Sequence, residues 1–163
     1  MKKYIFSILL VVCSIKLSAQ QLPIFTQSQI NSFLINPAYA GESDWANVFL
    51  HTRNMWAGMP DAPQQYYLTA DGMMPNPKIG LGITAYANAE PIIRNTGALV
   101  TYRYKLRLAD EHFLSGGISA GFIQNRLAFD KAIVSDDSEL SDFKGDWSSF
   151  NFDFNLGLLY QFR

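Results

Sequence analysis

Few side chains in this 163-residue sequence have the types and spacing that catalysis requires. The near-neutral bases are His51 and His112, and neither lies beside a serine in a nucleophile motif. The sequence contains no glycine-rich phosphate loop and no residues with the spacing of metal ligands. We therefore expect a protein that is not an enzyme and needs no cofactor, with His112 in a solvated turn beside Glu111.

One acidic segment has the composition of a calcium-binding loop. It contains Asp136, Asp137 and Glu139, followed by Asp142 and Asp146. These residues lack the spacing of an EF-hand loop and its terminal glutamate, which completes the oxygen cage around the ion. A solvated loop is therefore a better prediction than a calcium site.

Three basic residues, Arg103, Lys105 and Arg107, occupy alternate positions of a strand-like segment. Successive side chains of a strand point to opposite faces, so these three form a stripe on one face. A charged side chain that faces lipid at the bilayer centre costs about 2–4 kcal/mol, which favours a place in a lumen or near an aqueous end. The stripe could line a pore, bind an acidic segment, or pair with lumenal acids such as Asp153 and Asp71.

Apolar and polar residues alternate with a period of two in six segments, which include the basic stripe and the acids named with it. This alternation predicts a nearly all-β chain after the N-terminal region. The predicted strands are Trp45–Asn54, Gln64–Met73, Ile79–Ala87, a fourth that includes residues 98–107, Phe113–Leu127 and Phe150–Gln161. The last is the clearest, because Phe152, Phe154 and Leu156 fall on one face while Asp153 and Asn155 fall on the other.

Strand length and aromatic placement favour an outer-membrane barrel over the alternative, a soluble β-sandwich. Strands of about ten residues exceed the length typical of soluble sheets and are long enough to cross hydrocarbon at a tilt. Aromatic residues near the strand ends suit the interfacial girdle of a membrane barrel. They are Trp45, Tyr66, Tyr67, Tyr86, Phe113, Trp147, Phe150, Tyr160 and Phe162.

The connections between the predicted strands alternate in length. About ten residues separate the first two strands, about seven separate the third and fourth, and about 23 precede the last. The intervening turns, residues 74–78 and 109–112, are short. Outer-membrane barrels show this alternation of short periplasmic turns and longer extracellular loops.

The N-terminus has the features of a secretory signal peptide, and they divide the chain into three parts. Lys2 and Lys3 precede an apolar run of about a dozen residues, and Ala19 offers a small residue at the cleavage position. We expect a signal peptide at residues 1–19, a periplasmic segment at 20–44 and a partial transmembrane β-barrel at 45–163. Cleavage would leave 10 basic residues against 14 acidic ones, and this acidic balance argues against a nucleic-acid partner.

Two motifs carry a resemblance to a known family. The first is Asn36-Pro37-Ala38-Tyr39-Ala40-Gly41, and the second runs from Arg53 through Trp56 and Gly58 to Pro63. With shorter fragments that follow in the same order, such as Gly80-Leu81-Gly82 and Tyr102-Arg103-Tyr104, the sequence resembles the PorP/SprF family of type IX secretion system membrane proteins. Residues 36–41 are expected either to seal the base of the barrel or to contact a partner. Arg53 could face the lumen and pair with Asp61 or Asp71.

The resemblance implies a non-enzymatic protein of the cell outer membrane, exported through a cleaved signal peptide. Its implied partners are outer-membrane lipid, other type IX secretion components, and a secreted cargo or adhesin with a C-terminal secretion domain. The implied role is to assist export of that partner or to hold it at the surface. The alternative is a diffusion porin whose lumen is lined by the basic stripe.

Six strands are too few for a closed membrane barrel, because the smallest natural single-chain barrels have about eight. We therefore expect an antiparallel outer-membrane barrel that is incomplete, a half-barrel with the first and last strands at free edges. Members of the resembled family are longer, which makes this chain resemble an N-terminal part of a barrel. The alternative is a short subunit that completes a barrel by oligomerising.

Overall fold

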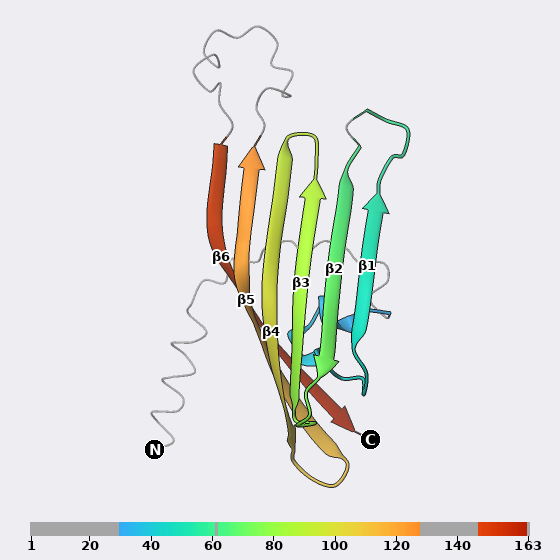
Figure 1. The fold of residues 1–163 in the computed structure, drawn as a ribbon, viewed down its shortest axis with the longest axis vertical. Helices are drawn as coiled ribbons and strands as arrows, with labels where there is room; N and C mark the ends of the chain where they lie inside the picture. The colour runs from blue at the N-terminus through green and yellow to red at the C-terminus, as the bar shows by residue number, and fades with distance from the viewer. Residues whose placement is uncertain (1–29, 61, 128–146, 163) are drawn as a thin grey trace, which may run out of the picture.

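The computed structural model describes residues 30–60, 62–127 and 147–162. They form one six-stranded antiparallel sheet in chain order (Figure 1). The strands are β1 (Asn47–Asn54), β2 (Gln64–Met73), β3 (Ile79–Ala89), β4 (Ile93–Arg107), β5 (His112–Leu127) and β6 (Trp147–Phe162). Two short 3-10 helices precede the sheet, η1 (Ser32–Leu34) and η2 (Pro37–Tyr39). No helix in this part of the chain has the length and apolar character that membrane crossing requires.

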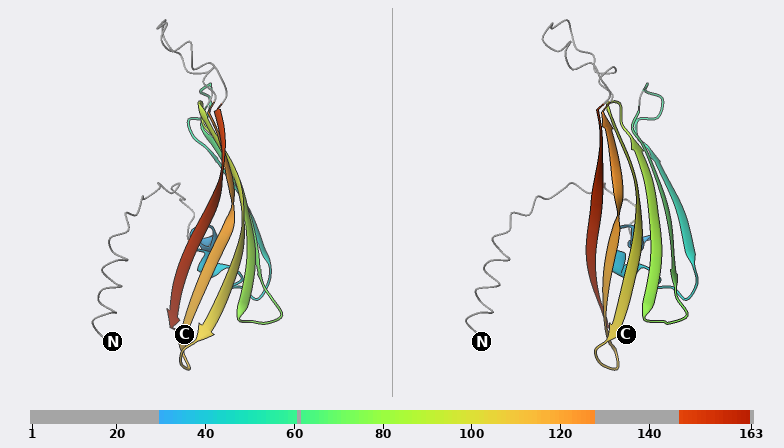
Figure 2. Two further views of the ribbon diagram at one scale, coloured as in Figure 1. Left: turned by 90° about the vertical axis from the view of Figure 1, so that its left-hand side faces the viewer. Right: turned by 60° about the vertical axis from the view of Figure 1, so that its left-hand side comes forward.

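The sheet is open and curved, as the sequence predicted. Each strand pairs only with its neighbours in the chain, so β1 and β6 lie at the two edges. The sheet bends around η1 and η2, which lie against its concave face (Figure 2). We call this the inner face and the opposite one the outer face. The predicted fold, an all-β antiparallel half-barrel of six strands, is confirmed.

Five of the six predicted strands differ at one or both ends, and the largest change falls on the connection between the third and fourth strands. The sequence predicted about seven residues between the third and fourth strands, but only residues 90–92 separate β3 from β4. The ladder continues through the pairs Asn88 with Asn95 and Ala89 with Arg94. The polar side chains of Asn88, Arg94 and Asn95 suggested a loop. The backbone hydrogen bonds of the hairpin instead extend β3 and β4 through these residues.

The outer face carries a continuous belt of exposed apolar side chains. Its members are Val48, Leu50, Tyr66, Leu68, Leu81, Ile83, Val100, Tyr102, Tyr104, Ile118, Phe122, Phe150, Phe152, Phe154, Leu156, Leu158 and Tyr160. From Phe150 to Tyr160 along β6 the belt measures about 34 Å at roughly 3.4 Å per residue, and about 26 Å along a membrane normal at a strand tilt of roughly 40°. The apolar band of outer-membrane barrels is about as tall, at roughly 25 Å.

Of the aromatic residues predicted for an interfacial girdle, Tyr67, Tyr86 and Phe113 lie on the inner face, and the register places Trp147 there too. Tyr67 is buried and stacks on Tyr86 with ring centroids 5.6 Å apart. Tyr86 in turn covers the backbone at Gly97, where a β-carbon would lie 2.6 Å from its ring. Phe113 lies beneath the Lys105 ammonium, 5.1 Å from the ring centroid. Position near a strand end could not distinguish these residues from the outward-facing aromatics, because neighbouring positions point to opposite faces.

Candidate functional site: the N-terminal plug and its buried arginine

Residues 31–42 cross the inner face as a compact segment that we call the plug. It contacts all six strands, mainly near the end of the sheet that carries the turns at residues 74–78 and 108–111 (Figures 1 and 2). Phe33, Ala38 and Ala40 are buried between the plug and the sheet. The plug is therefore a packed part of the fold.

Two asparagines fix the local conformation of the plug. Asn31 precedes η1, and its side-chain oxygen accepts a hydrogen bond from the Leu34 amide. Asn36 precedes η2 in extended geometry, as expected for a residue before proline, and its side-chain oxygen accepts from the Ala38 amide at 2.9 Å. Pro37 occupies the first helical position, where its missing N–H leaves no intrahelical hydrogen bond unmade.

The same asparagines join the plug to distant strands. The Asn31 amide nitrogen donates to the Thr69 hydroxyl on β2 at 2.8 Å. The Asn36 amide nitrogen donates to the Leu158 carbonyl on β6 at 3.1 Å. Each side chain therefore caps a 3-10 helix and also forms a hydrogen bond with the sheet.

Glycines on the inner face give the plug room to approach the sheet. A β-carbon at Gly80 would lie 2.0 Å from the Ala40 carbonyl oxygen, and one at Gly117 would lie 2.3 Å from the Pro37 carbonyl carbon. At Gly157 it would lie 2.0 Å from the Asn36 side-chain oxygen. Real β-carbons do not approach other atoms so closely, so the observed packing requires glycine at these positions.

Gly41 turns the chain out of the plug. Its φ of +62° lies in the left-handed region that glycine adopts without strain. Its amide donates a hydrogen bond of 2.8 Å to the Asp71 carboxylate on β2. A side chain here would also collide with the Gly72 carbonyl oxygen, 2.5 Å from the β-carbon position.

Arg103 of β4 holds the end of the plug with three hydrogen bonds. One guanidinium nitrogen donates to the Ala40 carbonyl at 3.0 Å and to the Gly41 carbonyl at 2.8 Å. The other donates to the Glu42 carboxylate at 2.7 Å. The Arg103 side chain is only 1% exposed, so its charge depends on these partners for the solvation that water would otherwise provide.

Glu42 links two strands that are not neighbours. Its carboxylate pairs with Arg103 and also lies 3.2 Å from the Lys105 ammonium, both on β4. It also accepts a hydrogen bond from the Gln161 amide on β6 at 3.2 Å. Because β5 lies between β4 and β6, this single side chain connects β4 to β6 across β5 at one end of the sheet.

The sequence-predicted candidates separate into two groups. Asn36, Pro37 and Gly41 come together with Arg103 and Lys105 at the plug. Tyr39 belongs to the same segment, is half-buried, and accepts a backbone hydrogen bond from Glu42 at 3.1 Å. Arg107 instead pairs with Asp110 in the adjoining turn, where its side chain is 60% exposed.

The second motif lies at the opposite end of the sheet, in the hairpin between β1 and β2 (Figure 1). Pro63 accepts a backbone hydrogen bond from Met55 that closes the hairpin. Trp56 and Gly58 both have positive φ and are exposed, and Arg53 lies opposite Gln65. The two motifs of the resemblance therefore mark opposite ends of the strands.

The acids expected to accompany the basic residues were partly wrong. Asp153 lies opposite Gly121, whereas Arg103 lies opposite Gly117, so the two belong to rows four residues apart. Arg53 and Asp71 cannot pair, because Asp71 lies opposite Asn47, six residues along β1 and about 20 Å away at roughly 3.4 Å per residue. Asp61, the other acid considered for Arg53, lies outside the described residues.

Glu42 is the functional residue that sequence reasoning missed. It directly follows the Asn36–Gly41 motif, and it is the first acidic residue of the chain. An acidic residue at the end of an apolar segment can signal a buried basic partner elsewhere in the chain. Only the fold identifies Arg103 as that partner.

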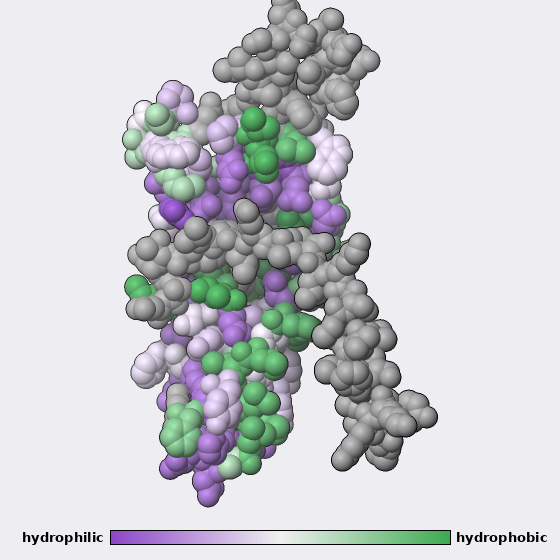
Figure 3. All heavy atoms as spheres, turned by 180° about the vertical axis from the view of Figure 1, so that it is seen from behind, coloured by the Kyte–Doolittle hydropathy of each residue, from purple (hydrophilic) through white to green (hydrophobic). Residues whose placement is uncertain are grey.

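Beyond the plug, the inner face carries a row of polar side chains across all six strands. Cross-strand neighbours in this inner polar row are Arg53, Gln65, Asn88, Asn95, Asn125 and Ser149. Figure 3 shows hydrophilic residues gathered in the upper half of this face. Most of the row is uncharged and half-buried. Such groups offer donors and acceptors without the cost of desolvating a charge.

Among the described residues, no group of three or more His, Cys, Asp or Glu side chains is placed to hold a metal ion. The acidic segment that includes Asp136 and Asp142 lies outside the described residues.

The fold and its two faces define a β-structured membrane protein, with an apolar belt on one side and a polar, plugged surface on the other. Residues 17–163 match the family described as type IX secretion system membrane protein PorP/SprF, and the chain belongs to that family. The comparison with curated proteins found no match, and neither did the comparison with solved structures.

Proposed function

We propose that this membrane component of type IX secretion recognises a secreted partner at the outer membrane and assists its export or holds it at the surface. The role requires binding but no catalysis. The partner would be a cargo or adhesin with a C-terminal secretion domain, and other secretion components would contact the same assembly. Membership of the family supports the secretion role.

The observation that carries the proposal is the inner polar row. Its amide side chains lie side by side on neighbouring strands, for example Asn88 opposite Asn95 and Asn95 opposite Asn125. A polypeptide in extended form presents one donor and one acceptor per residue, which such amides match. The row therefore suits a segment of protein chain.

The basic stripe gives the porin alternative no support. Arg103 is buried beneath the plug, and Lys105 and Arg107 pair with Glu42 and Asp110. A stripe whose charges are neutralised in this way does not present an open, cation-lined wall. We therefore assign Arg103 and Lys105 to anchoring the plug, and Arg107 to the turn that follows β4.

In the proposed location the apolar belt contacts outer-membrane lipid, and the plug occupies the periplasmic end. The signal peptide expected at residues 1–19 would bring the chain there. The segment expected in the periplasm, residues 20–44, would enter the inner face from that end through the plug. Lipid offers no hydrogen bonds to a free sheet edge, so β1 and β6 would each need a further strand beside them in the bilayer.

Site-specific photo-crosslinking in the native host tests the proposal. A photoreactive residue at Asn95 or Asn125 should form an adduct with a secreted protein that carries a C-terminal secretion domain. The same group at Val100, on the outer face, should form none with that protein. Deleting the gene should abolish surface display or release of the partner and leave small-solute uptake unchanged.

Loss of solute uptake without a secretion defect would reject the recognition role and favour the porin. Equal adduct formation at Asn95 and Val100 would reject the inner face as the contact surface.

A further inference from the structure

A second polar row crosses the outer face at the end of the sheet away from the plug. Cross-strand neighbours in this outer polar row are Asn54, Gln64, Ala89, Arg94, Arg126 and Ser148. The adjacent row toward the belt contains the aromatic residues Tyr66 and Phe150. The outer polar row therefore begins where the apolar belt ends, about 7 Å farther along the strands at roughly 3.4 Å per residue.

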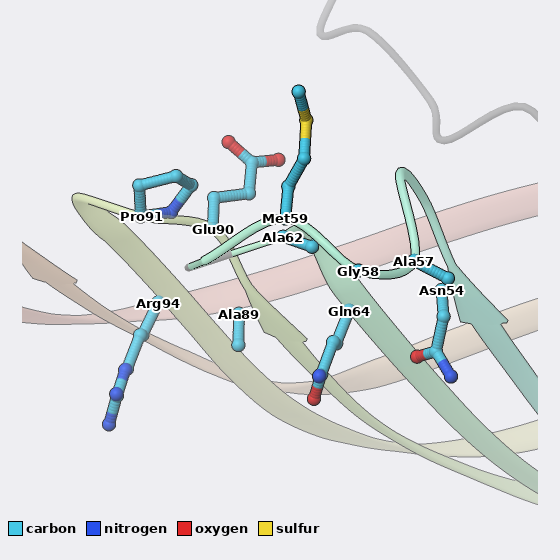
Figure 4. A pocket seen from close by; sticks show the side chains of 10 residues that line it. All are labelled: Asn54, Ala57, Gly58, Met59, Ala62, Gln64, Ala89, Glu90, Pro91 and Arg94. Carbon is cyan, nitrogen blue, oxygen red and sulfur yellow. The ribbon is translucent and has the colours of Figure 1, made fainter.

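Arg94 and Arg126 lie directly opposite each other in this row, and both are exposed. Like charges at directly opposed positions destabilise a sheet. Neither arginine takes part in the ion pairs seen among the described residues. Glu90 is the nearby acid, but its side chain and that of Arg94 point in opposite directions (Figure 4). The pair thus holds two positive charges that an anion would stabilise.

A hollow beside Arg94 offers space for such an anion. The cavity has a volume of about 490 Å³ and lies between the β1–β2 hairpin and the β3–β4 turn. Asn54 of β1, Gln64 of β2 and Arg94 of β4 project on one side of it, with Ala89 of β3 between Gln64 and Arg94 (Figure 4). The Gln64 side-chain oxygen accepts a hydrogen bond from the Tyr66 hydroxyl at 3.0 Å, which leaves the amide NH₂ as the group available to donate.

We propose that Arg94 and Arg126, assisted by the Gln64 amide, bind the phosphate of a membrane lipid headgroup. Guanidinium groups bind phosphate oxygens through paired hydrogen bonds, and two of them side by side suit a doubly charged phosphate monoester. A lipid bound here lays its acyl chains along the apolar belt, which starts one row below. The site lies at the headgroup level of the leaflet at this end of the sheet.

Native mass spectrometry of the full-length chain in detergent tests this site. The probes are phosphatidic acid, which carries a phosphate monoester, phosphatidylcholine with the same acyl chains, and inorganic phosphate. The variants are Arg94→Gln and Arg126→Gln, with Arg94→Lys to keep the charge and lose the paired geometry. Arg107→Gln is the matched control, because Arg107 is an exposed arginine at the other end of the sheet.

Phosphatidic acid should bind the unmodified chain more tightly than phosphatidylcholine, and each glutamine variant should weaken it roughly tenfold, as expected for loss of a charge-assisted hydrogen bond. Arg94→Lys should weaken it less, and Arg107→Gln should leave it unchanged. An equal loss in Arg107→Gln, or equal binding of the two lipids, would overturn the proposal. Displacement of phosphatidic acid by an equimolar amount of inorganic phosphate would show a free-anion site and reject the lipid.

Discussion

Replacing Arg103 by leucine should release the plug and lower the free energy of unfolding by about 3–5 kcal/mol, the usual cost of removing one partner of a buried ion pair. The Ala40 and Gly41 carbonyls would lose a donor, and Glu42 would lose its hydrogen bond from Arg103 while it keeps those from Lys105 and Gln161. Urea unfolding of the detergent-solubilised chain measures the stability. Limited proteolysis within residues 31–42 measures release of the plug.

Arg107→Leu is the matched control for this experiment. Its side chain is 60% exposed and its partner, Asp110, lies in the adjoining turn, so the loss should stay within about 1 kcal/mol, as for other surface ion pairs. The double variant Arg103→Met with Glu42→Met should recover part of the loss, because no buried charge remains unpaired. Equal stability of Arg103→Leu and Arg107→Leu would show that the buried arginine does not anchor the plug.

Gly117→Ala should displace the plug although it adds a single methyl group. The new β-carbon would lie 2.3 Å from the Pro37 carbonyl carbon and 2.4 Å from the Ala38 amide nitrogen, so backbone must move. Forcing extra volume into a packed site costs about 1–3 kcal/mol. The same unfolding and proteolysis measurements should show a less stable chain with an exposed plug.

The neighbouring glycine provides the control. Gly116 points to the outer face, where a β-carbon would meet only Leu158, at an ordinary 3.8 Å. Gly116→Ala should therefore change stability by no more than about 0.5 kcal/mol, the usual effect of a surface substitution. If the two alanine variants behaved alike, the close approach of plug and sheet would not contribute to stability.

The sheet was predictable because its information is local. Period-two alternation identified every strand, and consecutive antiparallel pairing of the first five follows from the short connections between them. The boundaries at β3 and β4 were less predictable. Asn88, Arg94 and Asn95 resemble loop residues, yet they pair because a hairpin ladder extends as far as its turn allows.

The candidate site was predictable only in pieces. The Asn36–Gly41 motif and the basic residues on β4 were both recognised from sequence, but nothing local connects them. Gly41 and Arg103 are 62 positions apart, and their contact exists because the curved sheet brings β4 beneath the plug. Glu42 was missed for the same reason, since a single acid near a motif has no meaning until its buried partner is known.

The central claim is that this sheet has one face toward lipid and one toward water or protein, and β6 tests it most directly. Cys13 is the only cysteine, so a Cys13→Ser background allows single spin labels at positions 150–160 in native membranes. Collision rates with oxygen, which concentrates in lipid, and with a water-soluble nickel chelate should alternate with a period of two. Oxygen contact should peak at Phe152, Phe154 and Leu156, and contact with the chelate should be highest at Asp153 and Asn155. Chelate access at both sets of positions would contradict the account, as would an oxygen maximum at Asp153.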